Sequence, residues 1–87
     1  MASYSTDLLN KVWGKGNVVA GKNPNLYRQD RYGNIIFKSS YGKQTPMGWE
    51  IDHLKPVSKG GTDHLNNLAP TYWHKNRQKG NKYPYKS

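Results

Sequence analysis

Three side chains in the second half of the sequence could together carry out chemistry on a phosphate group: Asp52, His53 and Asn76. Histidine titrates near neutral pH, so His53 could act as a general base that takes a proton from water. Asp52 and Asn76 supply oxygen donors, which hard cations such as Mg²⁺ and Mn²⁺ prefer. A base next to a hard cation suits hydrolysis of a phosphodiester, because the cation offsets the charge that builds up on the phosphate.

Basic residues surround Asn76. Lys75, Arg77, Lys79 and Lys82 lie within six residues of it and could bind phosphates of a substrate. The whole chain has 14 basic and 5 acidic residues, a net charge of +9. This excess predicts a polyanionic partner, of which nucleic acid is the usual one. Solubility is the alternative explanation, whereas Gly80 and Pro84 argue against a basic membrane-bound helix.

Length and composition set the limits for this chemistry. With 87 residues, 33% of them hydrophobic, we expect one domain with a thin core and no deep pocket for a large organic cofactor. The sequence has no apolar run of transmembrane length and no signal-peptide pattern at its start, so we expect a cytoplasmic protein, in a host cell if it comes from a phage. The absence of cysteine excludes disulfides and thiolate metal sites.

Four consecutive elements are predicted around the three side chains. Alternation over residues 49–54 predicts a strand with Asp52 on one face and His53 on the other. A glycine-containing loop over 58–63 and a short strand within 65–70 follow. A helix then starts with Thr71 as its cap and ends at Gly80.

The first half of the chain predicts a supporting scaffold. Apolar residues at helical spacing indicate a helix from Thr6, as its cap, through Trp13. A turn-rich stretch separates this helix from the turn at residues 32–34, which precedes a β-branched run at residues 35–37. The predicted fold class is therefore α+β, with a short helix and a hairpin-like segment before the chemistry-bearing half.

The order Asp52-His53, Gly60-Gly61, Asn67-Leu68 and Asn76-Arg77 resembles the HNH endonuclease family, in the small bacterial or phage form. The resemblance covers residues 49 to about 82 and implies a ββα-metal finger. It divides the single domain into a supporting segment (1–47), the finger (48–82) and a basic tail (83–87). Relatives with Cys-x-x-Cys pairs bind a structural zinc, which this chain cannot do, so the upstream elements must supply the support.

The resemblance also implies a role for each motif residue. His53 is the general base, and Asp52 and Asn76 hold one Mg²⁺ or Mn²⁺ ion. Asn67 holds the loop between the strands by hydrogen bonds. His74 lies about 200° around the helix from Asn76, so both cannot bind one ion.

Other aromatic and imidazole side chains are assigned to structure. His64 is predicted to be a turn residue. Trp49, Tyr72 and Trp73 are expected to belong to the core rather than to stack on bases.

The predicted function is therefore a metal-dependent endonuclease, a hydrolase that acts on DNA or also on RNA. One site per chain predicts nicking, with 5′-phosphate and 3′-hydroxyl products, and low intrinsic sequence specificity that a protein partner could supplement. A nucleic-acid-binding module without catalysis and the nuclease domain of an antibacterial toxin are the alternatives.

Overall fold

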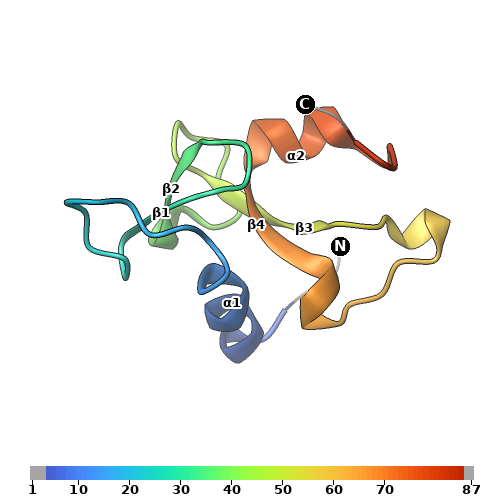
Figure 1. Cartoon of the computed structure of the whole chain (residues 1–87), viewed down its shortest axis with the longest axis horizontal. Helices are drawn as coiled ribbons and strands as arrows, with labels where there is room; N and C mark the ends of the chain where they lie inside the picture. The colour runs from blue at the N-terminus through green and yellow to red at the C-terminus, as the bar shows by residue number, and fades with distance from the viewer. Residues whose placement is uncertain (1–3, 86–87) are drawn as a thin grey trace.

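A computed structural model describes residues 4–85 and confirms the α+β fold class. Within these residues the chain forms two α-helices and two antiparallel hairpins, shown in Figure 1. The elements are α1 (Thr6–Trp13), β1 (Tyr27–Gln29), β2 (Ile35–Phe37), β3 (Trp49–His53), β4 (Leu68–Tyr72) and α2 (Trp73–Lys79). The helix and first hairpin precede a strand–loop–strand–helix unit in the C-terminal half, as predicted.

The first helix is confirmed, but its predicted cap is wrong by one residue. Ser5 is the N-cap, and its side chain accepts a hydrogen bond from the backbone N–H of Leu8 at 3.1 Å. Thr6, the predicted cap, is already helical. Both residues have the hydroxyl that a cap needs, so the sequence pattern alone did not separate them.

The C-terminal unit is built on the pairing of β3 with β4. Asp52 lies opposite Ala69, and His53 lies opposite Leu68. Two short 3₁₀ turns, Val57–Lys59 and Leu65–Asn67, occupy the connection between the strands. β4 therefore starts later than predicted, because the residues just before it form the second of these turns.

The start of the second helix also differs from the prediction. Thr71 is not a helix cap: it belongs to β4, where it pairs with Glu50, and its hydroxyl is buried and donates to Asp52. The helix begins at Trp73, whose backbone N–H donates to the carbonyl of Gly48. Gly80 ends the helix as predicted, with a positive φ of 55° that favours glycine.

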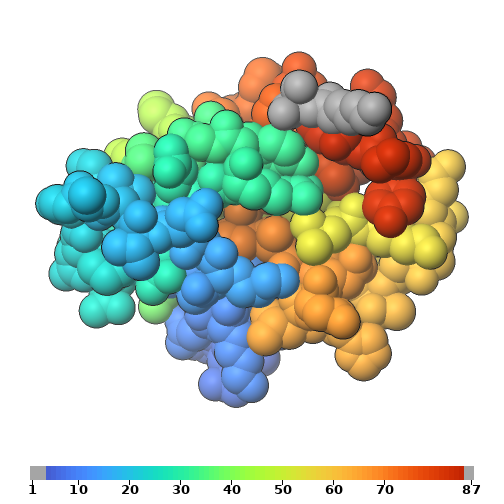
Figure 2. Space-filling model, in the orientation of Figure 1, coloured from blue at the N-terminus to red at the C-terminus, as the bar shows by residue number. Residues whose placement is uncertain are grey.

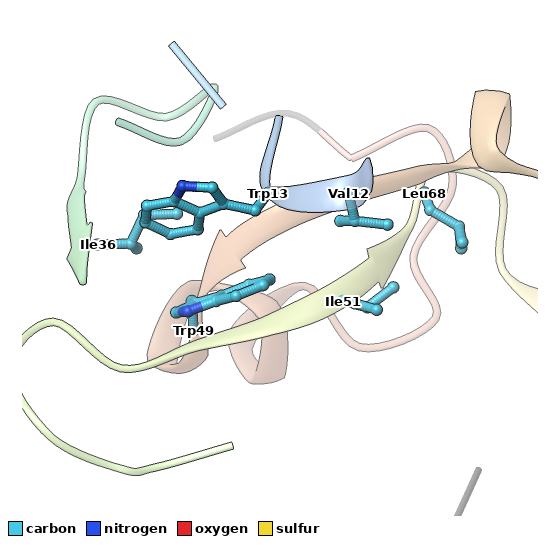
Figure 3. Packing of buried hydrophobic residues seen from close by; sticks show 6 residues of the cluster. All are labelled: Val12, Trp13, Ile36, Trp49, Ile51 and Leu68. Atoms are coloured by element: carbon cyan, nitrogen blue, oxygen red, sulfur yellow. The ribbon is translucent and has the colours of Figure 1, made fainter. Parts of the chain in front are cut away.

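The core lies between α1 and the two hairpins. Val12 and Trp13 of α1 belong to one buried cluster with Ile36 and Trp49, drawn in Figure 3. The ring centroids of Trp13 and Trp49 lie 5.2 Å apart. Ile51 and Leu68 extend this cluster toward the second hairpin. Trp49 is thus a core residue, as predicted.

The two other aromatic side chains assigned to structure lie at the margin of the core. Tyr72 packs against the core cluster while remaining partly exposed. Trp73 is also half-buried, and its ring N–H donates to the carbonyl of Thr45 at 2.8 Å.

A partly buried polar network braces the segment before β3. The guanidinium of Arg28 donates to the carbonyls of Pro24, Gly14 and Gly16, and the ring N–H of Trp13 donates to the same Pro24 carbonyl. These bonds tie the end of α1 to the turn-rich stretch and to β1. The chain has no cysteine, and hydrogen bonds of this kind hold the segment.

Asp30 and Lys15 are among the side chains that connect this segment to the C-terminal unit. Asp30 is 2% exposed and accepts a hydrogen bond from the backbone N–H of Tyr72 at the end of β4. The ammonium of Lys15 donates to the carbonyls of Leu65 and Leu68. Burial lowers the pKa of Lys15. Figure 2 shows the two parts of the chain, blue to green and yellow to red, packed side by side.

Neither helix within residues 4–85 combines the length and the apolar content that crossing a bilayer requires.

Candidate functional site

One pocket brings together the three side chains that the sequence singled out. It has a volume of about 370 Å³, and Asp52, His53 and Asn76 all line it, together with Lys79. Asp52 and His53 come from the end of β3, and Asn76 and Lys79 come from α2, which packs over that strand. Residues three apart on a helix lie on one face, so Asn76 and Lys79 both face β3.

Asp52 is buried and strongly paired. Its carboxylate is 2% exposed, and each oxygen accepts hydrogen bonds from side chains. Oδ1 accepts from the ammonium of Lys79 at 3.0 Å, and Oδ2 accepts from the guanidinium of Arg31 at 2.8 Å and from the Thr71 hydroxyl at 3.3 Å. Two cationic side chains therefore balance one buried negative charge.

Lys79 differs most from its prediction. The sequence predicts a phosphate-binding side chain, but Lys79 is 2% exposed. Its ammonium donates to Asp52 and to the backbone carbonyl of His53 at 2.9 Å. Lys79 lies in the last turn of α2, above β3, and an ammonium in that position needs acceptors because an unpaired buried charge is costly.

Asn76 is oriented by an acidic residue that the sequence analysis did not select. Its amide nitrogen donates to Glu50 at 3.0 Å, so its carbonyl oxygen is the atom left for a ligand. Glu50 also accepts from Arg77 at 2.8 Å, and this hydrogen bond raises the pKa of Arg77. Strand alternation could have identified Glu50, because it lies two residues before Asp52 on the same face of β3.

His53 pairs with a second acid that the sequence analysis missed. Its Nε2 lies 2.6 Å from Oδ1 of Asp63, an exposed residue in the loop between β3 and β4. A carboxylate can only accept a hydrogen bond, so the contact places the proton of a neutral His53 on Nε2 and leaves the lone pair on Nδ1. No spacing rule connects residues 53 and 63, since the pairing depends on the path of the loop.

Asn67 makes hydrogen bonds across the base of that loop. Its side-chain oxygen accepts from the backbone N–H of Lys55 at 2.8 Å. Its amide nitrogen donates to the carbonyls of Lys55 and Thr62, at 3.1 and 2.7 Å. These bonds hold the two ends of the β3–β4 connection together, and with it the segment that carries Asp63.

The remaining basic and imidazole side chains lie outside the pocket lining. The ammonium of Lys75 lies over the rings of Tyr32 and Tyr85, 5.3 and 5.7 Å from their centroids. Lys82 is exposed. His74 is exposed and packs its ring edge-to-face with Trp73, and His64 is exposed in the loop. Of the predicted basic tail, Lys86 and Ser87 lie outside the described residues.

The donor set suits a hard cation by chemical type. Within residues 4–85 no three histidine, cysteine, aspartate or glutamate side chains are grouped as metal ligands. The Asp52 carboxylate and the Asn76 carbonyl nevertheless share one open pocket, and both are oxygen donors of the kind that Mg²⁺ and Mn²⁺ accept. These two residues would hold such an ion, with water completing its coordination.

A strand–loop–strand–helix unit with Asp-His on the first strand and asparagine on the helix defines a ββα nuclease-type finger. The comparison with protein families agrees: residues 44–85 match the model described as HNH endonuclease. The C-terminal half of the chain thus belongs to the HNH endonuclease family. No curated protein and no solved structure matches the chain.

Proposed function

We propose that this protein is a metal-dependent endonuclease that hydrolyses phosphodiester bonds of DNA. The observation that carries the proposal is the shared pocket of Asp52, His53 and Asn76 within a segment of the HNH endonuclease family. One Mg²⁺ or Mn²⁺ ion, held by Asp52 and Asn76, would supply Lewis-acid stabilisation of charge on the phosphate.

His53 performs the proton transfer in this proposal. Its Nδ1 takes a proton from the attacking water, because Asp63 holds the other ring nitrogen as a hydrogen-bond donor. When His53 becomes a cation, the Asp63 carboxylate stabilises it by charge. Asn67 contributes indirectly, since it braces the loop that carries Asp63.

The substrate is proposed from charge. A net charge of +9 favours a polyanion, and Lys75, Arg77 and Lys82 lie on or just after the helix that carries Asn76. RNA offers the same phosphates, so the nuclease assay includes both nucleic acids. One pocket of this kind per chain favours nicking of one strand. We also propose low intrinsic sequence specificity, because contacts to phosphates are the same for every sequence, and a protein partner could raise it.

The decisive experiment is a nicking time course on supercoiled plasmid, with an RNA substrate assayed in parallel, in Mg²⁺, Mn²⁺ or EDTA. We expect cleavage with either ion and none with EDTA. His53→Ala should slow cleavage by about 10²- to 10⁴-fold, the usual contribution of a general base. His74→Ala is the matched control, since His74 lies outside the pocket, and it should cut like the parent.

Two results would reject the proposal. One is DNA binding without cleavage in any metal, which would instead support the non-catalytic binding module. The other is cleavage by His53→Ala at the parental rate, which would exclude His53 as the base.

A further inference from the structure

The ammonium of Lys79 pairs with the same carboxylate, that of Asp52, which would hold the metal ion. It is 3.0 Å from Oδ1 of Asp52 and 2.9 Å from the carbonyl of His53, and both charged side chains are 2% exposed. The other carboxylate oxygen is held by Arg31 and Thr71. Lys79 therefore already pairs with Oδ1, the carboxylate oxygen that Arg31 and Thr71 do not contact.

Electrostatic repulsion opposes simultaneous binding of a divalent cation and the Lys79 ammonium to this oxygen. A Mg²⁺ ion binds a carboxylate oxygen at about 2.1 Å, which would place it within about 5 Å of the Lys79 nitrogen. Three cations carrying four positive charges would then face one carboxylate in a poorly solvated position: the divalent ion, the ammonium of Lys79 and the guanidinium of Arg31. Like charges at this separation repel strongly where water is excluded.

Of the two cations, Lys79 is the one that can leave. Its ammonium is carried on a flexible four-carbon stem in the last turn of α2, beside Gly80, and the stem lines the open pocket. Arg31 comes from the N-terminal segment, holds the other carboxylate oxygen and is not among the residues that line this pocket. A small rotation of the Lys79 side chain would move its charge into the pocket without moving the backbone.

We propose that Lys79 is a built-in counter-ion of Asp52 and that a divalent cation binds by exchange with its ammonium. The exchange weakens metal binding, because each metal ion must displace one ion pair. It also moves the ammonium of Lys79 into the pocket, where it would pair with a phosphate of the substrate. This inference rests on the proposed function, since it takes Asp52 as a metal ligand.

The first test is Mn²⁺ binding to the full chain by titration calorimetry. Lys79→Met should bind Mn²⁺ about tenfold or more tightly than the parent, because the competing charge is gone. Lys59→Met is the matched control: it removes the same charge from an exposed loop position and should stay within about twofold of the parent. If Lys79→Met binds no more tightly than Lys59→Met, the exchange is overturned.

The second test needs no variant. Lysines of the parent protein are acetylated with an N-hydroxysuccinimide ester, with and without Mg²⁺, and the modified sites are measured by mass spectrometry. Bound Mg²⁺ should speed labelling of the buried Lys79 about tenfold, whereas labelling of the exposed Lys59 should not change. Continued protection of Lys79 at saturating Mg²⁺ would overturn the exchange even if the Met variant does not fold.

The two tests separate this inference from the proposed function. If the parent binds Mn²⁺ and nicks DNA while Lys79 stays protected, only the exchange fails. If the parent neither binds Mn²⁺ nor nicks DNA, both fail.

Discussion

Two buried aspartates, one in each half of the molecule, are held in opposite ways. Asp30 in the N-terminal segment accepts only from uncharged N–H groups: the backbones of Tyr32, Asn34 and Tyr72 and the amide of Asn34. Asp52 in the finger is balanced mainly by the charged side chains of Lys79 and Arg31. Both carboxylates are 2% exposed, so burial does not distinguish them.

This difference in hydrogen-bond partners suits Asp30 to a structural role and Asp52 to the exchange of ligands. Backbone N–H groups cannot move away without breaking the turn after β1 or the end of β4, so Asp30 is fixed once the chain folds. Side-chain cations can rotate away and be replaced by another cation. A buried carboxylate held by mobile cations beside an open pocket is therefore the one suited to exchange ligands, whereas the other serves as a clamp.

The largest effect, on the free energy of unfolding, is expected from removing the carboxylate of Asp30, which clamps the turn after β1 to the end of β4. Asp30→Ala leaves several part-buried N–H groups without an acceptor, and it should lower the free energy of unfolding by about 3–5 kcal/mol. That is most of the stability of a small domain. Urea denaturation measures the loss, and the exposed Asp7→Ala is the control, with a change of about 0.5 kcal/mol or less. A loss below about 1 kcal/mol for Asp30→Ala would mean that Asp30 is not the clamp.

The next effect distinguishes Asp52 from Asp30. A double variant, Asp52→Asn with Lys79→Met, removes the buried pair as a unit, and such replacements are often close to neutral for stability. We expect its free energy of unfolding to stay within about 2 kcal/mol of the parent, with cleavage slowed about 100-fold or more. Urea denaturation and plasmid nicking measure the two quantities. Parental cleavage by the double variant would exclude Asp52 from the chemistry.

The smallest effect concerns the exposed acid beside His53. Asp63→Ala should slow nicking by about tenfold, because His53 keeps its place on β3 but loses the partner that orients its ring. Asp63→Asn keeps a hydrogen-bond acceptor and should recover part of that loss. The matched control is Asp63→Glu, which retains the charge. Equal rates for all three variants and the parent would show that the contact does not serve catalysis.

Much of the fold could be predicted from the sequence because local patterns decided it. The apolar spacing of Leu8, Leu9 and Val12 indicated α1, and Gly80 marked the end of α2 through a conformation that glycine adopts easily. The predicted caps failed for a different reason. Ser5 and Thr6 are chemically equivalent as caps, and Thr71 was taken by the pairing of β4 with β3, a contact that lies far away in sequence.

The candidate site likewise contains residues that the sequence predicted and partners that only tertiary contacts determine. Residue types and spacing, together with the resemblance to the HNH family, predicted Asp52, His53 and Asn76, because a phosphodiester-cleaving site needs a base and oxygen donors in any arrangement. The partners of these residues, Lys79, Arg31, Glu50 and Asp63, were decided only by the tertiary structure. Charge pairing depends on which side chains burial brings within a few ångströms, and that follows from how α2, the loop and the N-terminal segment pack around β3.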